Sequence, residues 1–355
     1  MDRILTSYEP NLESNLYTMN VRRFIEESGF DVVPMKKVLT NPKLFMRCRI
    51  FNFNWFDEAN SRKEYIFKSL VLALLKINKK KIVYTLHNKQ PHDQEKNSYS
   101  LRLMKKMCRI SDVIVGLCPD TDKVIRSLYP AAAGKLRVIP HPNYIQNYDV
   151  YGEENLRKKY QFDDEDMVLL FLGYISPYKN IELIIEIIKN IPDKRIKLLI
   201  AGKVSSEEYR DEIIRMISGA SNIKYDFRYI PDDEIVGFYN TCDIVVLPYH
   251  KNSSLNSGAA YLSFSLRKTV VCPDIGTINA LKDKSFVYSY SYVTEEEHSR
   301  KLKECLNRLV MDYERDFESI HQKGFEAYKY VKKYHSDDII RELYRGTYSS
   351  LLKNN

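Results

Sequence analysis

The sequence predicts an α/β protein of two domains, each built on a parallel β-sheet that helices cover on both faces. Three observations indicate this fold class. The chain has 355 residues, which is too long for one compact core. Short apolar runs alternate with amphipathic segments of helix length, a pattern typical of parallel sheets. The alternation pauses in residues 139–155, which are rich in Pro, Asn and Tyr, and then resumes.

In the first half, apolar runs rich in β-branched and aromatic residues predict the strands, and amphipathic periodicity predicts the helices between them. The expected strands are 3–8, 31–35, 48–53, 81–87, 112–117 and 136–140, and the expected helices are 14–28, 61–78, 97–110 and 119–129. The first helix should end at Gly29, because glycine is favoured just past a helix end.

The second half repeats this pattern. The expected strands are 167–173, 196–202, 223–229, 243–248 and 269–274, and the expected helices are 179–191, 206–218, 231–241 and 255–265. Past residue 294 the chain is expected to be helical, opened by a capping box of Thr294 and Glu297, with a last helix at 336–352. We therefore predict domains at 1–148 and 149–334 and a C-terminal helix within 335–355.

Positive charge is concentrated in the first half of the chain. Residues 1–149 contain 25 Lys and Arg against 15 Asp and Glu, whereas the remainder is close to neutral. This imbalance predicts an anionic partner such as a nucleic acid or a membrane surface, and a solvated Lys-rich face is the alternative. The basic residues are scattered and no aromatic–basic recognition motif is present, which argues against nucleic acid.

Composition also bears on localisation and metal binding. No apolar run reaches the roughly 18 residues that a membrane span needs, and residues 1–10 do not resemble a signal peptide. The six cysteines show no metal-ligand spacing, so we expect reduced, buried thiols in a cytoplasmic protein. The acidic run at 163–166 precedes a strand and is expected to be a solvated loop, so no metal site is predicted.

The stretch YHKNSSLNSGAAYLSF, residues 249–264, follows a buried strand and opens a helix with small polar residues. Asn256, Ser257, Gly258 and Ala259 fit ordinary helix capping, because Ser and Asn are preferred N-cap residues. A helix N-terminus also binds anions, because its N–H groups are free and its dipole favours negative charge. The stretch alone leaves both interpretations open.

Lys179 favours the anion interpretation. It follows Gly173 and Pro177 at a predicted helix start, where the helix dipole disfavours a cation unless an anion lies nearby. Ligands of parallel sheets bind beyond the carboxyl ends of the strands. Lys179 and the amides near Ser257 follow two such ends, so we expect them to converge on one diphosphate. A solvated Lys179 is the alternative.

A second group of polar side chains follows the strand at 81–87. His87, Asn88, His92 and Asp93 lie there, and histidine transfers protons near neutral pH. These residues predict an active-site loop, and a structural hydrogen bond of His87 beside a solvated loop is the alternative. His141, in the joining segment, is assigned to the cleft or to packing.

Four segments carry a resemblance to a known family. FLGYISPYKN (171–180) is similar to F-x-G-R-x-x-P-x-K-G, and YNTCDIVVLPY (239–249) to L-Y-x-x-A-D-x-x-V-L-P-S. HNKQPH (87–92) and VIPHPNY (138–144) are similar to segments of related polysaccharide enzymes. The chain thus resembles the GT-B-fold glycosyltransferases of polysaccharide biosynthesis, called group 1 or glycosyltransferase family 4. This resemblance implies two Rossmann-like domains and a C-terminal helix that crosses back to the first.

The resemblance also implies a donor site. The family's lysine contacts the donor diphosphate, so Lys179 takes that role. The donor-binding residues implied or proposed around it are Gly173, Tyr174, Lys179, Arg228, Ile230, Tyr249, Ser254, Asn256, Ser257, Gly258 and Ala259. The family's E-x7-E pair falls on Ser254 and Leu262, and Tyr174 replaces its arginine, so the donor sugar and the stereochemical outcome stay open.

The implied activity is metal-independent hexosyl transfer without a cofactor. A UDP- or GDP-linked sugar would be the donor, and a saccharide or lipid-linked saccharide the acceptor. An inverting enzyme needs a base, for which His87 and Asp93 are candidates, whereas in a retaining enzyme His87 would contact the sugar. A nucleotide-sugar epimerase and a nucleic-acid-binding protein are the alternatives.

The basic first half and the helix in 63–81 fit peripheral association with the inner face of a membrane. The apolar residues of that helix equally fit burial against its own sheet.

Overall fold

The computed structural model of the protein describes residues 4–9, 15–90, 98–148, 155–193, 195–251 and 254–353. The chain divides into two compact units. The first consists of Met1–Pro142, Asn252–Asn256 and His335–Asn355, and the second of Asn143–Lys251 and Ser257–Tyr334. The division after Pro142 falls earlier than the boundary expected at residue 148.

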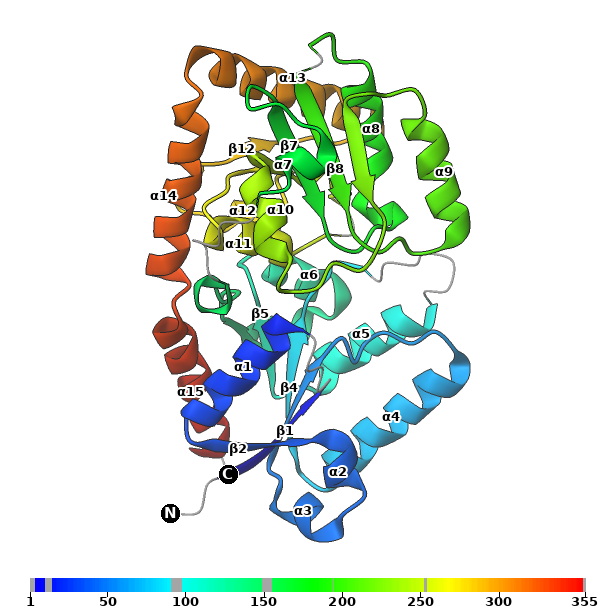
Figure 1. Ribbon diagram of the computed structural model, residues 1–355. Helices are drawn as coiled ribbons and strands as arrows, with labels where there is room; N and C mark the ends of the chain where they lie inside the picture. The colour runs from blue at the N-terminus through cyan, green and yellow to red at the C-terminus, as the bar shows by residue number, and fades with distance from the viewer. Residues whose placement is uncertain are drawn as a thin grey trace. The chain divides into compact units, whose positions relative to one another are not determined.

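A six-stranded parallel sheet forms the centre of the first unit (Figure 1), in the order β2-β1-β3-β4-β5-β6. Its strands are β1 (Ile4–Glu9), β2 (Phe30–Pro34), β3 (Ile50–Asn54), β4 (Lys81–Leu86), β5 (Val113–Gly116) and β6 (Leu136–Val138). Every residue of β3 is buried, as expected for a strand covered on both faces. The chain builds outward from β1 in both directions, so the topological switch point lies between β1 and β3.

Six helices from the first part of the chain and one from its end belong to this unit. They are α1 (Leu16–Glu27), α2 (Met35–Leu39), α3 (Pro42–Arg47), α4 (Arg62–Ile77), α5 (Ser98–Ile110), α6 (Thr121–Leu128) and α15 (Asp337–Lys353). Asn15 caps α1 by accepting the N–H of Thr18 at 3.2 Å, and the helix ends before Gly29, which has a φ of +94°, as predicted. α15 packs against α1, and its Tyr344 and Tyr348 lie in the same buried cluster as Phe24.

The second unit contains another six-stranded parallel sheet, in the order β12-β11-β10-β7-β8-β9. Its strands are β7 (Met167–Leu172), β8 (Ile196–Ala201), β9 (Ile223–Asp226), β10 (Ile244–Val246), β11 (Val270–Pro273) and β12 (Tyr288–Tyr290). β7 is buried throughout and pairs with β10 through Ile244 to Leu169 and Val245 to Leu170. The switch point of this sheet therefore lies between β7 and β10.

The helices of the second unit are α7 (Arg157–Tyr160), α8 (Ile181–Lys189), α9 (Glu207–Ile217), α10 (Ile235–Thr241), α11 (Gly258–Ser265), α12 (Gly276–Asn279), α13 (Glu295–Arg315) and α14 (Glu318–Tyr334). Short 3-10 helices occur at Pro130–Lys135 in the first unit and at Ile145–Asn147 and Pro177–Lys179 in the second. Thr294 caps α13 by accepting the N–H of Glu297 at 3.3 Å, as predicted. The Glu297 carboxylate, however, accepts the N–H of Val293 at 2.8 Å and does not complete the predicted box.

The two sheets confirm the predicted α/β fold, and each predicted strand is present. Strand β12 was not predicted, and the helical region past residue 294 contains α13, α14 and α15. No helix within the described ranges is both long enough and apolar enough to cross a bilayer. All six cysteines are buried and carry free thiols, as predicted.

The ends of β7 and β8 approach each other closely at two glycines. Gly173 and Gly202 have φ values of +136° and +139°, and a Cβ on Gly202 would lie 1.8 Å from the carbonyl oxygen of Gly173. Only glycine fits at position 202, since both the space and the backbone conformation exclude a side chain. This contact fixes where the loop after β7 begins.

Candidate functional site

Lys179 lies in the loop after β7, at the switch point of the second sheet. It ends the 3-10 helix Pro177–Lys179, and Asn180 then adopts a left-handed conformation with a φ of +56° before α8 begins at Ile181. Lys179 was predicted to lie at a helix start, whereas Asn180 stands between it and the first residue of α8. Its ammonium packs on the ring faces of Tyr249 and Tyr178, 4.2 and 5.0 Å from their centroids.

The charge of Lys179 has no counter-ion among the described residues. No carboxylate within the described part of the chain forms an ion pair with it, and burial lowers its pKa to about 8. A bound phosphate would supply the missing negative charge and raise the pKa again. The surroundings of Lys179 thus favour an anionic ligand.

Tyr249 connects Lys179 with the start of α11. It follows β10, its ring is buried beneath the Lys179 ammonium, and its hydroxyl accepts a hydrogen bond from Ser257 Oγ at 3.4 Å. The loops that follow β7 and β10 therefore meet at Tyr249. Lys179 and α11 lie at one switch point although they are far apart in the sequence.

The first turn of α11 combines capping with free amides. Ser257 Oγ accepts the N–H of Ala260 at 3.1 Å, and the N–H of Ser257 donates to Thr277 Oγ1 at 2.9 Å. In the described chain the N–H groups of Gly258 and Ala259 have no acceptor. Helix capping and anion binding are therefore compatible here, because one N–H is capped and the first two remain available.

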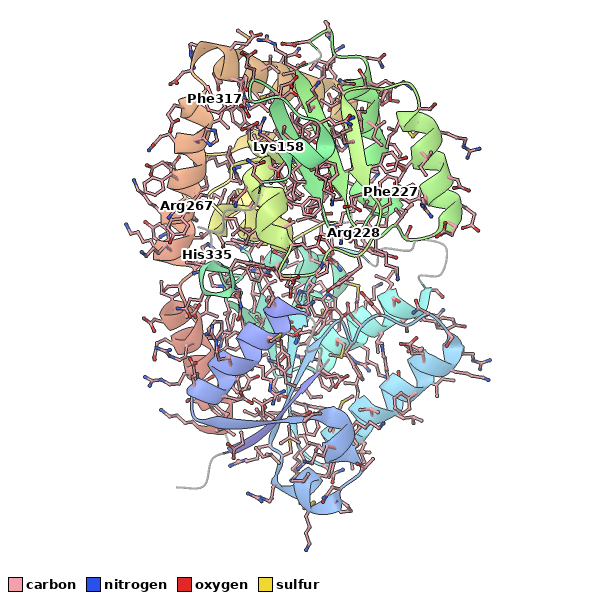
Figure 2. All side chains as sticks on the ribbon, viewed as in Figure 1. Lys158, Phe227, Arg228, Arg267, Phe317 and His335 are labelled. Atoms are coloured by element: carbon pink, nitrogen blue, oxygen red, sulfur yellow. The ribbon has the colours of Figure 1, made fainter. Side chains whose placement is uncertain are left out.

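The other residues predicted for the donor site lie in varied surroundings. Gly173 and Tyr174 are exposed after β7, and Ile230 is buried. Arg228 lies beside Phe227 in the loop after β9 (Figure 2). Strand β9 ends at Asp226, whereas the predicted strand ends at residue 229. The guanidinium of Arg228 pairs with Glu234 and, at 3.1 Å, with Asp226, and these carboxylates raise its pKa. Its charge is thus balanced within the protein, unlike that of Lys179.

Ser254 and Asn256 belong to the first unit. Ser254 is buried, and the Asn256 side-chain amide donates to the backbone oxygen of His87 at 3.0 Å. Asn256 Oδ1 is buried and has no hydrogen-bond partner among the described residues. Leaving a buried acceptor unpaired costs free energy, and a hydroxyl group of a ligand would satisfy it.

His87 follows β4 and is held by aromatic and amide groups. Its ring stacks on Trp55, with centroids 4.1 Å apart, and meets the edge of Tyr17 at 5.3 Å. Its Nε2 lies 3.0 Å from Asn54 Oδ1. Burial, and to a smaller extent the nearby His141, lower its pKa to about 3, so His87 is neutral at physiological pH.

A chain of amides selects the tautomer of His87. The Asn52 amide donates to the Tyr348 hydroxyl at 2.7 Å, which leaves Asn52 Oδ1 to accept from the Asn54 amide at 3.3 Å. Asn54 Oδ1 must then accept from His87, so the ring proton is on Nε2 and the lone pair is on Nδ1. Asn52 and Asn54 could have been singled out from the sequence, because two polar residues two positions apart in a buried strand require hydrogen-bond partners.

The remaining residues predicted for the first unit are less informative. His141 is buried, its backbone oxygen accepts a 2.7 Å hydrogen bond from His335, and burial lowers its pKa to about 4. Asn88 is half-buried, and His92 and Asp93 lie outside the described residues. His87 is thus the predicted proton-transfer residue whose geometry the structure describes.

A cavity of about 500 Å³ opens at the switch point of the first sheet. It is lined by Glu9, Asn15, Met35, Asn54, Trp55, Phe56, Glu58, Phe67 and Lys68. Burial raises the pKa of Glu9 and of Glu58, a property common among functional carboxyls. Aromatic faces beside carboxyl and amide groups can hold a saccharide ring. This cavity could not be predicted from the sequence, because its lining comes from β1, α2, β3, α4 and residues outside these elements.

The acidic run at 163–166 is exposed at its first three residues, as predicted, but not at Asp166. Asp166 is buried and accepts the N–H of Asp163 at 2.8 Å, and Lys197 lies 3.6 Å from its carboxylate. Asp166 thus fixes the turn before β7, a structural role.

Comparisons with known proteins agree with this arrangement. Residues 152–257 match the family described as glycosyl transferases group 1. The GDP-mannose:glycolipid 4-beta-D-mannosyltransferase of Xanthomonas campestris is 25% identical over 283 residues, which cover 76% of this chain and 73% of the relative. The lipopolysaccharide 1,2-N-acetylglucosaminetransferase of Salmonella typhimurium is 28% identical over 130 residues, which cover 34% and 33%.

Solved structures share the fold over the whole chain. Anabaena HepE in complex with UDP has a TM-score of 0.71 at 15% identity, covering 98% of this chain and 100% of HepE. Sucrose-phosphate synthase from Thermosynechococcus elongatus has a TM-score of 0.75 at 12% identity, covering 100% of both chains.

Two parallel sheets of this topology define a GT-B-fold protein. The match of residues 152–257 to group 1 and the curated relatives support a glycosyltransferase of the group 1 type.

Proposed function

We propose that the protein transfers a hexose from a nucleoside-diphosphate hexose to a hydroxyl of a lipid-linked saccharide during surface polysaccharide assembly. The observation that carries the proposal is the convergence of Lys179, Tyr249 and the first turn of α11 at one switch point. Lys179 and the N–H groups of Gly258 and Ala259 would stabilise the negative charge that develops on the leaving diphosphate. This role requires only groups that the chain itself provides.

The proposed reaction inverts the anomeric configuration. The Xanthomonas campestris relative is named for a β-linked product of GDP-mannose, whose sugar is α-linked. Ser254 and Leu262 stand where the family's paired glutamates would be. An inverting transfer needs a base for the acceptor hydroxyl, and we assign this role to the Nδ1 lone pair of His87, whose pKa a bound diphosphate would have to raise from its value in the free protein. Asp93 stays a second candidate from the sequence.

The cavity of the first unit is the proposed acceptor site. Trp55 lines it and also stacks on His87, so a saccharide bound there would lie next to the proposed base. Glu9, Glu58 and Asn15 supply the polar groups that sugar hydroxyls need. Phe67 of α4 lies at its edge, so the cavity adjoins an apolar surface.

The exposed face of α4 supports a lipid-linked acceptor and peripheral membrane association. Val71, Leu72 and Leu75 are buried against the unit, so burial accounts for only part of this helix. Five large apolar side chains are instead exposed on its outer side, Ile66, Phe67, Leu70, Leu74 and Ile77. A neighbouring cavity of about 370 Å³ is lined by Arg102, Lys105, Lys106 and Arg109 together with Tyr65, Leu128 and Tyr129. An apolar face beside a basic hollow suits the surface of an anionic membrane.

The donor can be identified by thermal unfolding with UDP, GDP, CDP and ADP at millimolar concentration. We expect one nucleotide to raise the melting temperature, because a ligand at 100 times its Kd adds about 2.7 kcal/mol. The corresponding nucleotide hexose should then release nucleoside diphosphate only when a lipid-linked acceptor is present. Stabilisation by none of the four, or sugar isomerisation without acceptor, would contradict the proposed function.

Vesicle sedimentation tests the membrane surface. Wild-type protein should bind vesicles that contain phosphatidylglycerol and release them at high salt, because screening weakens the basic contribution. The Phe67→Ser/Leu70→Ser double variant should bind at least tenfold more weakly, since each buried apolar side chain contributes about 1.5–3 kcal/mol. Val293→Ser/Met311→Ser removes two apolar side chains of the second unit that are more exposed than Phe67 and Leu70, and it is the control. Equal binding of the two double variants would refute the assignment of α4.

A further inference from the structure

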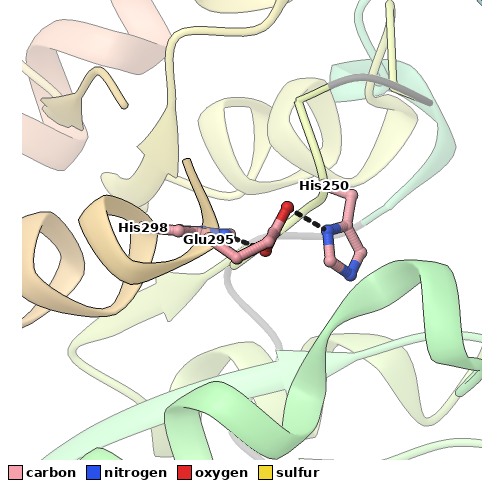
Figure 3. A group of neighbouring side chains, drawn as sticks. All are labelled: His250, Glu295 and His298. Carbon is pink, nitrogen blue, oxygen red and sulfur yellow. Dashed lines mark ion pairs between the residues drawn. The ribbon is translucent and has the colours of Figure 1, made fainter. Parts of the chain in front are cut away.

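Three metal-ligating side chains meet in the second unit beside the donor site (Figure 3). His250 lies in the loop after β10, and Glu295 and His298 lie one turn apart at the start of α13. One ligand atom of each lies within 4.8 Å of the other two. The Glu295 carboxylate stands between the imidazoles, with Oε1 3.4 Å from His250 Nδ1 and Oε2 3.7 Å from His298 Nδ1.

These separations fit a shared cation. Ligands held about 2.0–2.1 Å from a tetrahedral zinc ion stand roughly 3.4 Å apart, which is close to the distance from Glu295 Oε1 to His250 Nδ1, and Oε2 offers a second ligand atom beside His298. Two imidazoles and one carboxylate form a ligand set typical of zinc with one open position. Calcium and magnesium prefer oxygen ligands, so the two histidines exclude them as the favoured ions.

The imidazole of His298 is oriented as a metal ligand. It is fully buried, stacks on Tyr292 with centroids 3.9 Å apart, and its Nε2 lies 2.9 Å from the Tyr290 hydroxyl. Asn180 directs its amide nitrogen at His298 Nδ1, at 3.3 Å. Because that nitrogen only donates, Nδ1 carries the lone pair and the ring proton goes from Nε2 to Tyr290. Metal-binding histidines are commonly held in this way by a partner on the second nitrogen.

In this tautomer no proton lies between His298 Nδ1 and the Glu295 carboxylate. The lone pair of Nδ1 and a carboxylate oxygen are both acceptors, and they face each other at 3.7 Å. Asn180 donates to the Nδ1 lone pair, and a cation in its place would bind both the lone pair and the carboxylate.

We propose that His250, Glu295 and His298 bind one divalent cation of the zinc class, with the fourth position open to solvent. The site revises the expectation that the protein has no metal site. His250 and His298 are far apart in the sequence and share no motif, so spacing carried no signal. The cation would tie the loop that contains Tyr249 to the start of α13. It would also replace the Asn180 hydrogen bond, and Asn180 directly follows Lys179.

Titration of the full chain with Zn²⁺ tests this site. Protein without an affinity tag, stripped with a chelator and dialysed, would be titrated by calorimetry, with Co²⁺ as a second ion whose visible absorption reports tetrahedral geometry. We expect one equivalent to bind. His250→Asn and Glu295→Gln should each weaken binding at least tenfold, and both positions are partly exposed, which favours retention of the fold. Tyr290→Phe should weaken it about tenfold, because it removes only the partner of Nε2.

The matched controls are His321→Asn and Glu304→Gln, a partly exposed histidine and an exposed glutamate of the same unit. Both should bind Zn²⁺ as wild type does. Absence of saturable binding to wild type would overturn the proposal. Equal affinity in the His250→Asn/Glu295→Gln double variant would overturn it as well, since binding would then occur elsewhere.

Discussion

Replacing Lys179 with Ala is expected to lower kcat for sugar transfer by about 10²- to 10³-fold, the usual loss when one preorganised charge-stabilising group is removed. Lys179 is a cation without a carboxylate partner in the described chain. Tyr249 contacts both its ammonium and Ser257 at the start of α11. Its loss would leave the diphosphate with fewer groups to stabilise its charge. The measurement is transfer from the nucleotide sugar that the donor screen identifies.

Lys203→Ala is the matched control, because Lys203 is an exposed lysine in the loop after the neighbouring strand β8. It should leave kcat unchanged. Equal activity of Lys179→Ala and Lys203→Ala would refute the role of Lys179.

The pH dependence of nucleotide binding checks the same role through the charge. Burial lowers the pKa of free Lys179 to about 8, so wild-type affinity for the diphosphate should fall as pH rises through about 8. Lys179→Arg stays charged and should bind without this decrease. In the free protein, stability changes with pH in the opposite direction to nucleotide affinity. Because the unfolded chain holds the Lys179 proton more tightly, the free energy of unfolding should rise between about pH 8 and the unfolded pKa of about 10.4.

Replacing His87 with Gln is expected to lower kcat by about 10²- to 10⁴-fold while nucleotide affinity stays the same, as for loss of a general base. His87 belongs to the first unit and stacks on Trp55, which lines the acceptor cavity. Its loss should therefore affect chemistry and acceptor use but not the donor diphosphate. The measurement separates kcat from the nucleotide Kd, and His321→Gln is the control.

Nitrogen NMR of the His87 ring gives a readout that a purely structural role would not change. The resonances should show a proton on Nε2 and no titration above about pH 3 in the free protein. Asn54→Asp places a carboxylate at Nε2 and should raise that pKa, because a nearby negative charge favours the imidazolium. A proton on Nδ1 in the wild type would exclude His87 as the base.

The fold was largely predictable because the strands of a buried parallel sheet are continuous apolar runs in the sequence. β7 reads MVLLFL and is buried at every position. β12 escaped prediction because it has only three residues, Tyr288–Tyr290, at the edge of the sheet, and serines interrupt its apolar pattern. The division of α13 from α14 could not be predicted either, since Asp316 and Phe317 separate them without a glycine or a proline.

The site was predictable in part. The small residues of α11 and the position of Lys179 after a strand were visible in the sequence, as were the polar Asn52 and Asn54 of β3. Their partners were not. The contact of Lys179 with Tyr249 depends on β10 pairing with β7, and the amide chain to His87 starts at Tyr348 in α15. Such pairings depend on strand order and helix placement, which local patterns do not encode.

The position of α15 in the first unit has a consequence for the order in which the protein folds. Chains emerge from the ribosome from their N-terminus, and domains fold as their residues become available. Ile340, Tyr344 and Tyr348 complete the cluster around Phe24, yet they are synthesised after the whole second unit. The first unit must therefore wait with an unfinished core while the second is made. The Tyr348 hydroxyl that begins the amide chain to His87 also arrives only then, so the proposed base acquires its tautomer only after the second unit has been synthesised.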